Sequence, residues 1–573
     1  MKTVIAFMLM TGVWVLASCA QKQTEDQRFE ALANSYIEKL LEMKPEWATY
    51  LGDHRYDHRL NDYSLEGVER ELNLHNAFLD SLDSIEVDRL SLDNSIDYKI
   101  LRSNIEYAIF QLDILKEHEW NPLVYNIGGA IYGLLVREFA PLKDRLLNVK
   151  ERLKAIPSVL EQAKKNLKNP PKVHTETAIL QNKGNISLIQ DQLNEFLDQV
   201  PELKEEFAPI QAQAVTALEE YGTWLKNELL PKSNGEFRIG DKKFRKKLHF
   251  TLTSDLSKEE ILERAEADLI KTQNNMYETA LPLFKKFFPN ITDPTNKKLV
   301  IKKVLDNLAE THPNNETIVD FAKKTLQTCT DFVRAQNVIT VPDEPLKIIV
   351  MPEFQRGVAV AYCDSPGPLE EKGETFYAIS PTPEDWSEKR VESFFREYNN
   401  YMLEDLTVHE AMPGHYLQLA HANKFKAPTK IRAIFSSGTF VEGWATYAEQ
   451  LMVEKGYGGP EVKMQQLKMR LRLIINAIID QKIHTAGMTE KEAMDLMMNE
   501  GFQEEGEAAG KWRRACLTST QLSTYYVGNA EVNDLRKAYE AKMGPAYSMK
   551  TMHDQMLSFG SPAAKHLKEL LEL

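Results

Sequence analysis

Apolar residues recur at helical spacing over most of this chain, and this periodicity limits its fold more than any other feature. The first example runs from Phe29 to Leu41, and Thr24 with Gln27 can form a capping box in front of it. No regular alternation of strands and helices suggests a doubly wound fold. We therefore predict a mainly α-helical protein, with further helices at residues 64–85, 92–116, 142–166, 184–199, 203–229, about 255–335, and about 391 to the end.

Two short runs of the sequence favour β-strands instead. Residues 346–351 and 375–380 are apolar and β-prone, and Gly- and Pro-rich sequence separates them. We interpret them as two strands of a small antiparallel sheet beside a central cleft. The second run, taken as residues 374–380, could bind an extended peptide by edge addition. Residues 231–247 contain Asn-Gly and Gly-Asp pairs and predict a hairpin or an exposed loop.

The N-terminus has the features of an export signal. Lys2 precedes an apolar run that ends at Leu16, which is shorter than the roughly 20 residues of a membrane-spanning helix. Leu16-Ala17-Ser18-Cys19 resembles the lipobox of bacterial lipoproteins, in which the cysteine carries the lipid. We predict a signal peptide at residues 1–18, lipidation of Cys19, and a linker at residues 19–24. The mature protein is then exported and anchored at the periplasmic face of a bacterial membrane, for which we expect the outer membrane. A plain cleaved signal or a membrane anchor is the alternative.

The charge of the chain argues against one class of partner. The formal net charge is −14, and removal of residues 1–18 removes only one charged residue, Lys2. Because phosphate binding depends on an excess of Lys and Arg, we expect no nucleic-acid partner. The cysteines other than Cys19 lie far apart in the sequence and predict no disulfide framework; they are Cys329, Cys363 and Cys516.

The segment His-Glu-Ala-Met-Pro-Gly-His at residues 409–415 carries the residue types of a hydrolytic metal site. Such a site needs about three protein ligands, an open position for water, and a carboxylate that takes the proton of that water. An adjacent His and Glu supply a ligand and a base within one helical turn, as in His-Glu-x-x-His. For imidazole and carboxylate ligands with an open position zinc is the preferred ion, and Mn and Co are the alternatives.

The spacing of the two histidines requires a break in the helix. Residues six apart lie about 240° apart around a regular helix, so His409 and His415 could not both face one ion. Pro413 removes a helical hydrogen bond, and Gly414 allows conformations that other residues avoid. We therefore predict a distorted turn at residues 412–414 that brings His415 back to the side of His409.

A third ligand is expected from an apolar segment at residues 440–449. Glu442 and Glu449 are seven apart and lie on nearly the same helix face, where a carboxylate is costly unless it is paired or metal-bound. Glu442 is preferred because Gly443 beside it allows another backbone to approach closely.

Two further residues near the motif have alternative interpretations. His421, six residues after His415, is the rival to Glu442 as third ligand. Asp405, one turn before His409, could orient the His409 imidazole or could be a solvated charge near the helix N-terminus.

These motifs resemble those of the bacterial family called domain of unknown function 885. Its members carry His-Glu-Ala-x-Pro-Gly-His followed by Glu-Gly-Trp-Ala, which occur here at residues 409–415 and 442–445. The resemblance covers essentially the whole mature chain. It includes Pro-x-x-Ala-Thr-x-x-Gly at residues 45–52 and Thr-Gln-x-x-x-Tyr-Tyr-x-Gly at residues 520–528.

The resemblance implies a gluzincin-like metallopeptidase, with two His ligands, a downstream Glu ligand, and the Glu of the motif as base. In this sequence the implied zinc ligands are His409, His415 and Glu442, and the implied base is Glu410. The family often has a second His after the motif, where Tyr416 stands here. That difference affects an accessory position and leaves the ligand set intact.

The resemblance also draws attention to the C-terminal part of the chain. A tetrahedral intermediate needs a donor for its oxyanion, and His484 and Tyr525 are the candidates for this catalytic role. The alternatives are a helix-end histidine with satisfied hydrogen bonds and a tyrosine that only packs in the core. Gln521, one turn before Tyr525, is a candidate for contact with the substrate backbone. The same part of the sequence contains Arg472, Asp480 and Tyr526.

Three functions are compatible with these patterns. The first is zinc-dependent hydrolysis of peptide bonds, in short peptides, with Glu410 as general base. The second is metal-dependent hydrolysis of an amide or ester that is not a peptide, and the third is a catalytically inactive lipoprotein that binds a partner at its surface. We expect an N-terminal helical region at residues 25–250 and a catalytic region at residues 251–573, integrated into one domain. No oligomeric state is predicted.

Overall fold

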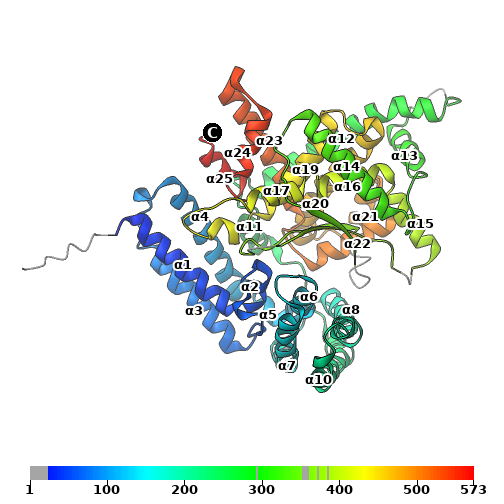
Figure 1. Ribbon diagram of the computed structural model, residues 1–573. Coiled ribbons are helices and arrows are strands. Elements are labelled where there is room, and N and C mark those ends of the chain that lie inside the picture. Colours follow the sequence, from blue (N-terminus) through cyan, green and yellow to red (C-terminus); the bar gives the residue numbers. More distant parts are fainter. Residues whose placement is uncertain (1–22, 292–294, 352–359, 371–372, 384–385) are drawn as a thin grey trace, which may run out of the picture.

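The computed structural model describes residues 23–291, 295–351, 360–370, 373–383 and 386–573. Helices make up most of the molecule, and one small sheet lies within the C-terminal part (Figure 1), so the prediction of a mainly helical fold is confirmed. The predicted signal peptide, Cys19 and most of the linker lie outside the described residues. None of the described helices is long and apolar enough to cross a membrane.

The N-terminal helices enclose two apolar clusters. The predicted capping box is present at the first helix, where the Gln27 N–H donates to Thr24 Oγ1 at 3.2 Å. These helices are α1 (Glu25–Met43), α2 (Pro45–Leu51), α3 (Leu65–Leu82), α4 (Leu92–Ile109), α5 (Glu117–Trp120), α6 (Gly128–Val136), α7 (Leu142–Asn166), α8 (Lys172–Ser187), α9 (Leu193–Leu197) and α10 (Lys204–Trp224).

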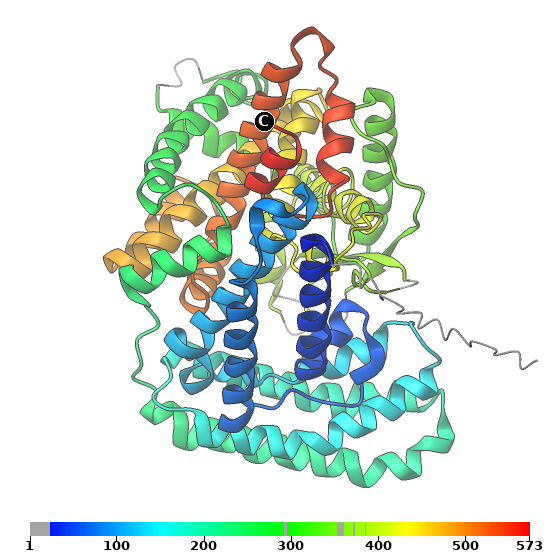
Figure 2. The same cartoon turned by 90° about the vertical axis from the view of Figure 1, so that its left-hand side faces the viewer.

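The N-terminal helices pack directly on the rest of the chain. One cluster joins α1, α3 and α4 to Ile431 and Ile434 of the C-terminal part, and the other lies within residues 125–229. Figure 2 shows the two sets: the blue helices run down from the C-terminal helices to a layer of cyan and blue-green helices. The N-terminal helices α1, α3 and α4 therefore pack against the segment of the C-terminal part that contains Ile431 and Ile434.

The predicted loop at residues 231–247 is wrong in its second half. Residues from 240 onward form α11 (Gly240–Leu252), and its apolar face packs against the helix that carries Ile474. Phe244 and Leu248 are four apart and buried, so helical amphipathicity outweighs the Gly-Asp turn signal. Gly240, with φ +76°, supplies the turn at the start of this helix.

The C-terminal part is built around a long helix that is buried over most of its length, α20 (Gly459–Ala486). A capping box of Thr489 and Glu492 is present at the start of α21 (Glu490–Asn499). The remaining helices are α12 (Lys258–Phe287), α13 (Lys297–Leu308), α14 (Ile318–Gln336), α15 (Glu388–Glu397), α16 (Asn400–Glu410), α17 (His415–Ala422), α18 (Ile431–Ile434), α19 (Gly438–Glu454), α21 (Glu490–Asn499), α22 (Glu505–Leu517), α23 (Ser523–Met543), α24 (Met549–Leu557) and α25 (Ala564–Leu570).

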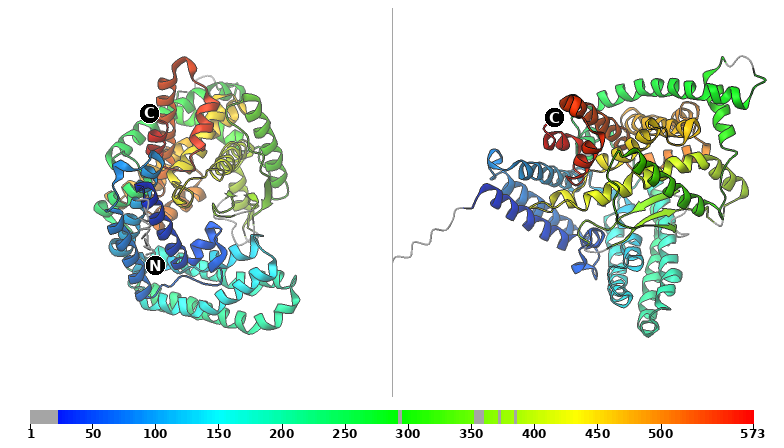
Figure 3. Two further views of the ribbon diagram at one scale, coloured as in Figure 1. Left: turned by 60° about the vertical axis from the view of Figure 1, so that its left-hand side comes forward. Right: turned by 45° about the horizontal axis from the view of Figure 1, so that its top comes forward.

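The sheet has three strands in the order β1 (Leu346–Val350), β3 (Thr375–Ile379), β2 (Ala361–Asp364). Both predicted strands are present as β1 and β3, but they run parallel, so the predicted antiparallel pairing is wrong for them. The short strand β2, which the sequence analysis missed, pairs antiparallel with β3. In the right-hand view of Figure 3 the sheet lies between the C-terminal helices and the cyan N-terminal helices, and Arg137 after α6 pairs with Asp364 of β2.

The position of β3 also corrects the predicted peptide contact. β3 lies at the centre of the sheet, with β1 on one edge and β2 on the other. A peptide therefore has no free edge on residues 374–380. Among the described residues, β1 and β2 form the two edges of the sheet.

Two glycines allow helices α19 and α23 to cross in direct backbone contact. A Cβ on Gly443 would overlap the backbone of Gly528, and a Cβ on Gly528 would overlap the Thr439 carbonyl oxygen. The close approach predicted for Gly443 is therefore confirmed. This crossing sets the position of the residues next to it, Glu442 on α19 and Tyr525 on α23.

We expect Gly528→Ala to destabilise the protein by about 1–3 kcal/mol, because the added methyl group must push two helices apart. Thermal unfolding of the purified variant measures the effect. Gly510→Ala on α22 is the matched control, since a Cβ there meets no atom within 4 Å. Equal unfolding temperatures for both variants would contradict the packing described here.

Candidate metal centre

The helix that carries His409 ends where the sequence predicted a break. Helix α16 stops at Glu410 and α17 begins at His415. Between them the Met412–Pro413 peptide is cis, and the Gly414 N–H donates to the Val408 carbonyl at 2.9 Å. The predicted distorted turn is therefore present.

Gly414 has the unusual backbone conformation that the sequence predicted for it. Its φ of −74° and ψ of −128° lie outside the α and β regions that are open to residues with a Cβ. A Cβ at this position would overlap the carbonyl oxygens of His409 and Val408. Glycine is needed because the turn folds back tightly against the last turn of α16.

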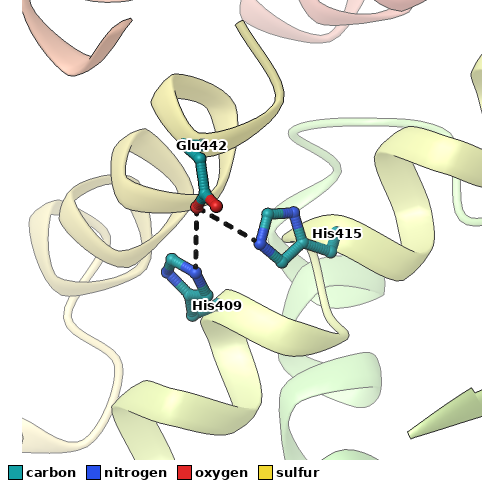
Figure 4. Close-up of side chains that lie close together, drawn as sticks. All are labelled: His409, His415 and Glu442. Carbon is teal, nitrogen blue, oxygen red and sulfur yellow. Dashed lines mark ion pairs between the residues drawn. The ribbon is translucent and has the colours of Figure 1, made fainter. Parts of the chain in front are cut away.

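Three side chains converge on one point, as Figure 4 shows. His409 comes from α16, His415 from α17 and Glu442 from α19. Glu442 Oε2 lies 3.7 Å from His409 Nε2 and 3.6 Å from His415 Nε2. One ligand atom from each of the three residues lies within 4.8 Å of the others. The structure thus brings together the three residues predicted as metal ligands.

The donor set fits a divalent cation. Ligand atoms about 2.1 Å from a tetrahedral zinc ion are roughly 3.4 Å apart, which is close to the two shorter separations here. Within the described part of the chain, Glu442 Oε2 is buried and has no hydrogen-bond partner. Burial disfavours its charge, but the imidazoles of His409 and His415 outweigh burial and hold the pKa of Glu442 below its usual range. An ionised carboxylate between two imidazoles is a suitable ligand set for zinc.

Glu449 orients the imidazole of His409, a role that the sequence analysis considered for Asp405. His409 Nδ1 lies 2.6 Å from Glu449 Oε1, so Nδ1–H donates to this carboxylate and Nε2 is the ring atom that faces Glu442. Glu449 follows Glu442 by two helical turns on α19, which explains how both reach His409. Asp405 is buried beside Glu449, and burial followed by the Glu449 charge raises the pKa of Asp405 well above its usual value. The solvated charge considered as the alternative for Asp405 is therefore also wrong.

Loss of the Glu449 carboxylate should weaken zinc binding by about 10- to 100-fold, the usual effect of removing a group that orients a metal ligand. We expect affinity to fall from wild type to Glu449→Gln and further to Glu449→Ala, because glutamine can still accept from Nδ1–H. Competition with a chromophoric chelator measures the affinity. Glu454→Gln, at the exposed end of α19, is the control, and unchanged affinity in Glu449→Ala would refute this role.

Glu410 is held beside the ligands by the edge strand of the sheet. Its Oε2 accepts the Cys363 N–H of β2 at 3.0 Å. This N–H donates to Glu410 and is directed away from β3, so Glu410 lies along the outer side of β2. Burial, followed by the Glu410 charge, raises the pKa of the Cys363 thiol well above its usual value, which disfavours a thiolate nucleophile.

The residues after Glu442 connect its helix to the rest of the site. Trp444 Nε1 donates to the Pro413 carbonyl at 2.9 Å and so joins α19 to the turn between the two histidines. Gly443 brings α23 against α19, as described above. Glu-Gly-Trp therefore supplies a ligand, a close helix contact and a hydrogen bond in consecutive residues.

Tyr525 lies near the ligand group, and Arg514 of α22 contacts it. Arg514 Nη2 donates to Tyr525 Oη at 3.0 Å and to Gln521 Oε1 at 2.8 Å. Burial, followed by the charge of Glu442, raises the pKa of Tyr525, so its hydroxyl stays protonated and able to donate. Tyr525 and Gln521 thus lie together on the α23 side of the site.

His484 lies in a different environment from Tyr525. Its Nε2 is 2.9 Å from the Ala515 carbonyl and 2.8 Å from the Thr518 carbonyl, and its ring stacks on Phe244. These contacts are those of a helix-end histidine with a satisfied donor, the alternative named above. We therefore leave His484 out of the proposed mechanism.

The other polar residues singled out in the sequence also have structural partners. Asp480 accepts the N–H groups of Thr520 and Ser523 at 2.9 and 3.0 Å and thereby fixes the start of α23. Arg472 pairs with Glu397 at 2.5 Å. His421, the rival ligand, contacts the Thr340 carbonyl at 2.7 Å and does not join the ligand group.

Sequence reasoning missed two contributions to the site. The Cys363 N–H comes from a four-residue strand with no clear β pattern, so no local signal could have found it. Arg514 reaches Tyr525 from another helix, and only the pairing of α22 with α23 reveals this. The role of Glu449 had a signal, since it stands seven residues after Glu442 in an apolar helix.

Fold and site together define a mainly helical protein with a small mixed sheet and a group of two histidines and a glutamate, of which His409 is buried and the other two are partly buried. Over residues 45–571 the chain matches the family described as bacterial protein of unknown function (DUF885), and it belongs to that family. The family resemblance found in the sequence is thereby confirmed. A comparison with curated proteins finds no match.

Two solved structures share the fold. A candidate lipoprotein of unknown function from Shewanella oneidensis is 33% identical, with a TM-score of 0.81, and the match covers 95% of this chain and 100% of that one. A candidate lipoprotein from Colwellia psychrerythraea is 17% identical, with a TM-score of 0.78, and the match covers 96% of this chain and 99% of that one. The second match shows the fold alone.

Proposed function

We propose that this protein is a gluzincin-like zinc peptidase that hydrolyses short peptides. The observation that carries the proposal is the convergence of His409, His415 and Glu442, whose ligand atoms lie within 4.8 Å of one another. Glu410, next to His409 in the sequence, lies beside them on the edge of β2. Ligands and a positioned carboxylate are the parts that metal-assisted hydrolysis requires.

Each residue of the site has a distinct role in this proposal. His409, His415 and Glu442 would hold the zinc ion, which would supply Lewis-acid chemistry by polarising the scissile carbonyl and lowering the pKa of water. Glu410 takes the proton of the attacking water and delivers it to the leaving amine, and the Cys363 N–H holds its carboxylate in place. Glu449 keeps the Nε2 lone pair of His409 directed at the ligand group. Tyr525 donates its hydroxyl hydrogen to the oxyanion of the carbonyl.

The position of β2 at the edge of the described sheet supports a peptide as the substrate. Since the Cys363 N–H is directed outward to Glu410, this edge faces the proposed base. An extended peptide that lies along this edge, while the Cys363 N–H stays bonded to Glu410, brings a backbone carbonyl next to the site. The edge contact first assigned to residues 374–380 is thus proposed for residues 361–364.

We further propose that the protein is an exported lipoprotein, with residues 1–18 as signal peptide and a lipid on Cys19. The Leu-Ala-Ser-Cys segment supports this assignment, and both similar structures are described as candidate lipoproteins. The periplasmic face of the outer membrane is the proposed location.

Metal analysis of the purified protein combined with digestion of a peptide library tests the function. We expect about one zinc per chain, and peptide cleavage that stops after verified metal removal and returns with zinc. Equal cleavage by the metal-free protein would contradict the proposal. A zinc-loaded protein that cleaves other amides or esters but no peptide would favour the second function class. A metal-free protein without turnover would favour the binding lipoprotein.

A further inference from the structure

Helix α22 places cationic side chains close to the candidate metal centre. Gly443 follows Glu442 and packs against Gly528, and Tyr525 lies one helical turn before Gly528. Arg514 of α22 contacts the Tyr525 hydroxyl at 3.0 Å. A short chain of contacts therefore leads from the proposed ligand Glu442 to the guanidinium of Arg514.

The partners of Arg514 leave its charge uncompensated. It donates to the neutral groups Gln521 Oε1 and Tyr525 Oη at 2.8 and 3.0 Å. Among the residues that the structure describes, no carboxylate lies within ion-pair distance of it. A half-buried guanidinium with neutral partners retains its preference for an anion, and its planar donors match a carboxylate.

Lys511 lies one helical turn before Arg514 on α22, with a side chain that is 10% exposed. Its Nζ is 3.9 Å from Glu507 Oε1, which is too long for a hydrogen bond. Burial, opposed by Glu507, lowers the pKa of Lys511 to about 8, so the amine is mostly charged at neutral pH. The charges of Arg514 and Glu442 also act on this pKa, which agrees with a position near both.

Positive charge exceeds negative charge in the buried network behind α22. Lys468 and Arg472 both pair with Glu397, at 2.7 and 2.5 Å. Arg472 and Lys511 share the remaining carboxylate, Glu507, at 3.8 and 3.9 Å. With Arg514 included, these cations outnumber the two carboxylates, although the chain as a whole has a net charge of −14. Such a local excess beside a cleavage site favours an anionic group of the substrate.

We propose that Lys511 and Arg514 form a carboxylate-binding subsite that receives the C-terminal carboxylate of a short peptide. The inference rests on the proposed peptidase function and narrows it to cleavage near the C-terminus. Binding of the carboxylate at α22 fixes the distance from the peptide end to the bond that lies beside Glu410. The carboxylate of an acidic side chain could bind to the same two cations. The experiment below distinguishes it from the C-terminal carboxylate.

The zinc-loaded protein is tested on N-acetylated hexapeptide libraries in three forms. The first has a free C-terminal carboxylate, the second a C-terminal amide, and the third an amide with Glu at one of the last two positions. We expect kcat/KM to be about 10-fold higher for the free acids than for both amide libraries, mainly through KM, since a charge-assisted contact is lost. Mass spectrometry should place the cleaved bond at a constant distance from the C-terminus.

Substitutions of Lys511 and Arg514 test whether these two cations cause the preference for a free C-terminal carboxylate. Arg514→Gln and Lys511→Met should each reduce the ratio of acid to amide cleavage towards one, and Arg514→Lys should retain part of it. Arg513→Gln is the matched control on α22, because Arg513 donates to Thr177 of α8 instead. Zinc content and the unfolding temperature verify that each variant is folded.

Several results would overturn the subsite. Equal cleavage of acids and amides by the wild type would do so, and recovery of cleavage in the Glu-containing amides would assign the cations to an acidic side chain instead. An Arg514→Gln variant that loses acid and amide cleavage equally would show that Arg514 only positions Tyr525. If no library is cleaved, the peptidase function fails. Equal retention of acid and amide libraries on the zinc-loaded protein would then reject the subsite as well.

Discussion

Glu410→Gln should bind zinc as the wild type does and lose most of its peptidase turnover. Glutamine keeps the size of the side chain and can still accept the Cys363 N–H, so the edge of β2 stays in place. It cannot take a proton from water. Since general base catalysis contributes about 10²- to 10⁴-fold, we expect kcat to fall by that factor.

Single-turnover kinetics and metal analysis of the same preparation measure this effect. Glu404→Gln is the matched control, because Glu404 lies on the same helix and makes no contact with the ligand group. We expect Glu404→Gln to keep near-normal turnover. A Glu410→Gln enzyme with near-normal turnover would remove Glu410 from the mechanism, and one that lost its zinc would indicate a structural role.

Glu442→Ala should abolish tight zinc binding and, with it, activity. The variant keeps the two imidazole ligands and lacks the third ligand, the carboxylate. The loss of zinc affinity should therefore exceed the effect of removing a group that only orients a ligand, which is about 10- to 100-fold. Zinc content after dialysis measures the loss. His421→Ala is the control, because His421 contacts the Thr340 carbonyl outside the ligand group.

Thermal unfolding gives a second readout that does not depend on activity. A ligand that binds only the folded state stabilises it by about 4 kcal/mol at 1,000 times its Kd. A chelator should therefore lower the Tm of the wild type and of His421→Ala, and leave the Tm of Glu442→Ala unchanged. A chelator effect of equal size on all three proteins would show that Glu442 is not a ligand.

The helical part of the fold could be predicted because each helix carries its own signal. Apolar spacing and capping residues such as Thr24 and Thr489 lie within a few positions of one another. The sheet could be predicted less well. β2 comes between β1 and β3 in the sequence and runs in the opposite direction, which allows β3 to lie parallel to β1. β2 has only four residues. A strand so short has no periodicity to detect.

The site shows the same contrast between local and long-range information. His409, His415 and the need for a turn follow from spacing within seven residues, and the turn is present. The unusual conformation of Gly414 was predicted, but the close approach of the turn to the carbonyl of His409 could not be read from the sequence. His484 was assigned by its residue type, and its actual partners come from α22 and the segment after it.

The most direct test of the metal centre is a crystal structure of the zinc-soaked or zinc-purified protein with anomalous data at the zinc edge. We predict one strong peak, bound by Nε2 of His409, Nε2 of His415 and the carboxylate of Glu442, with Glu449 on His409 Nδ1. Three side chains that point to separate places, or a peak located elsewhere in the molecule, would contradict it.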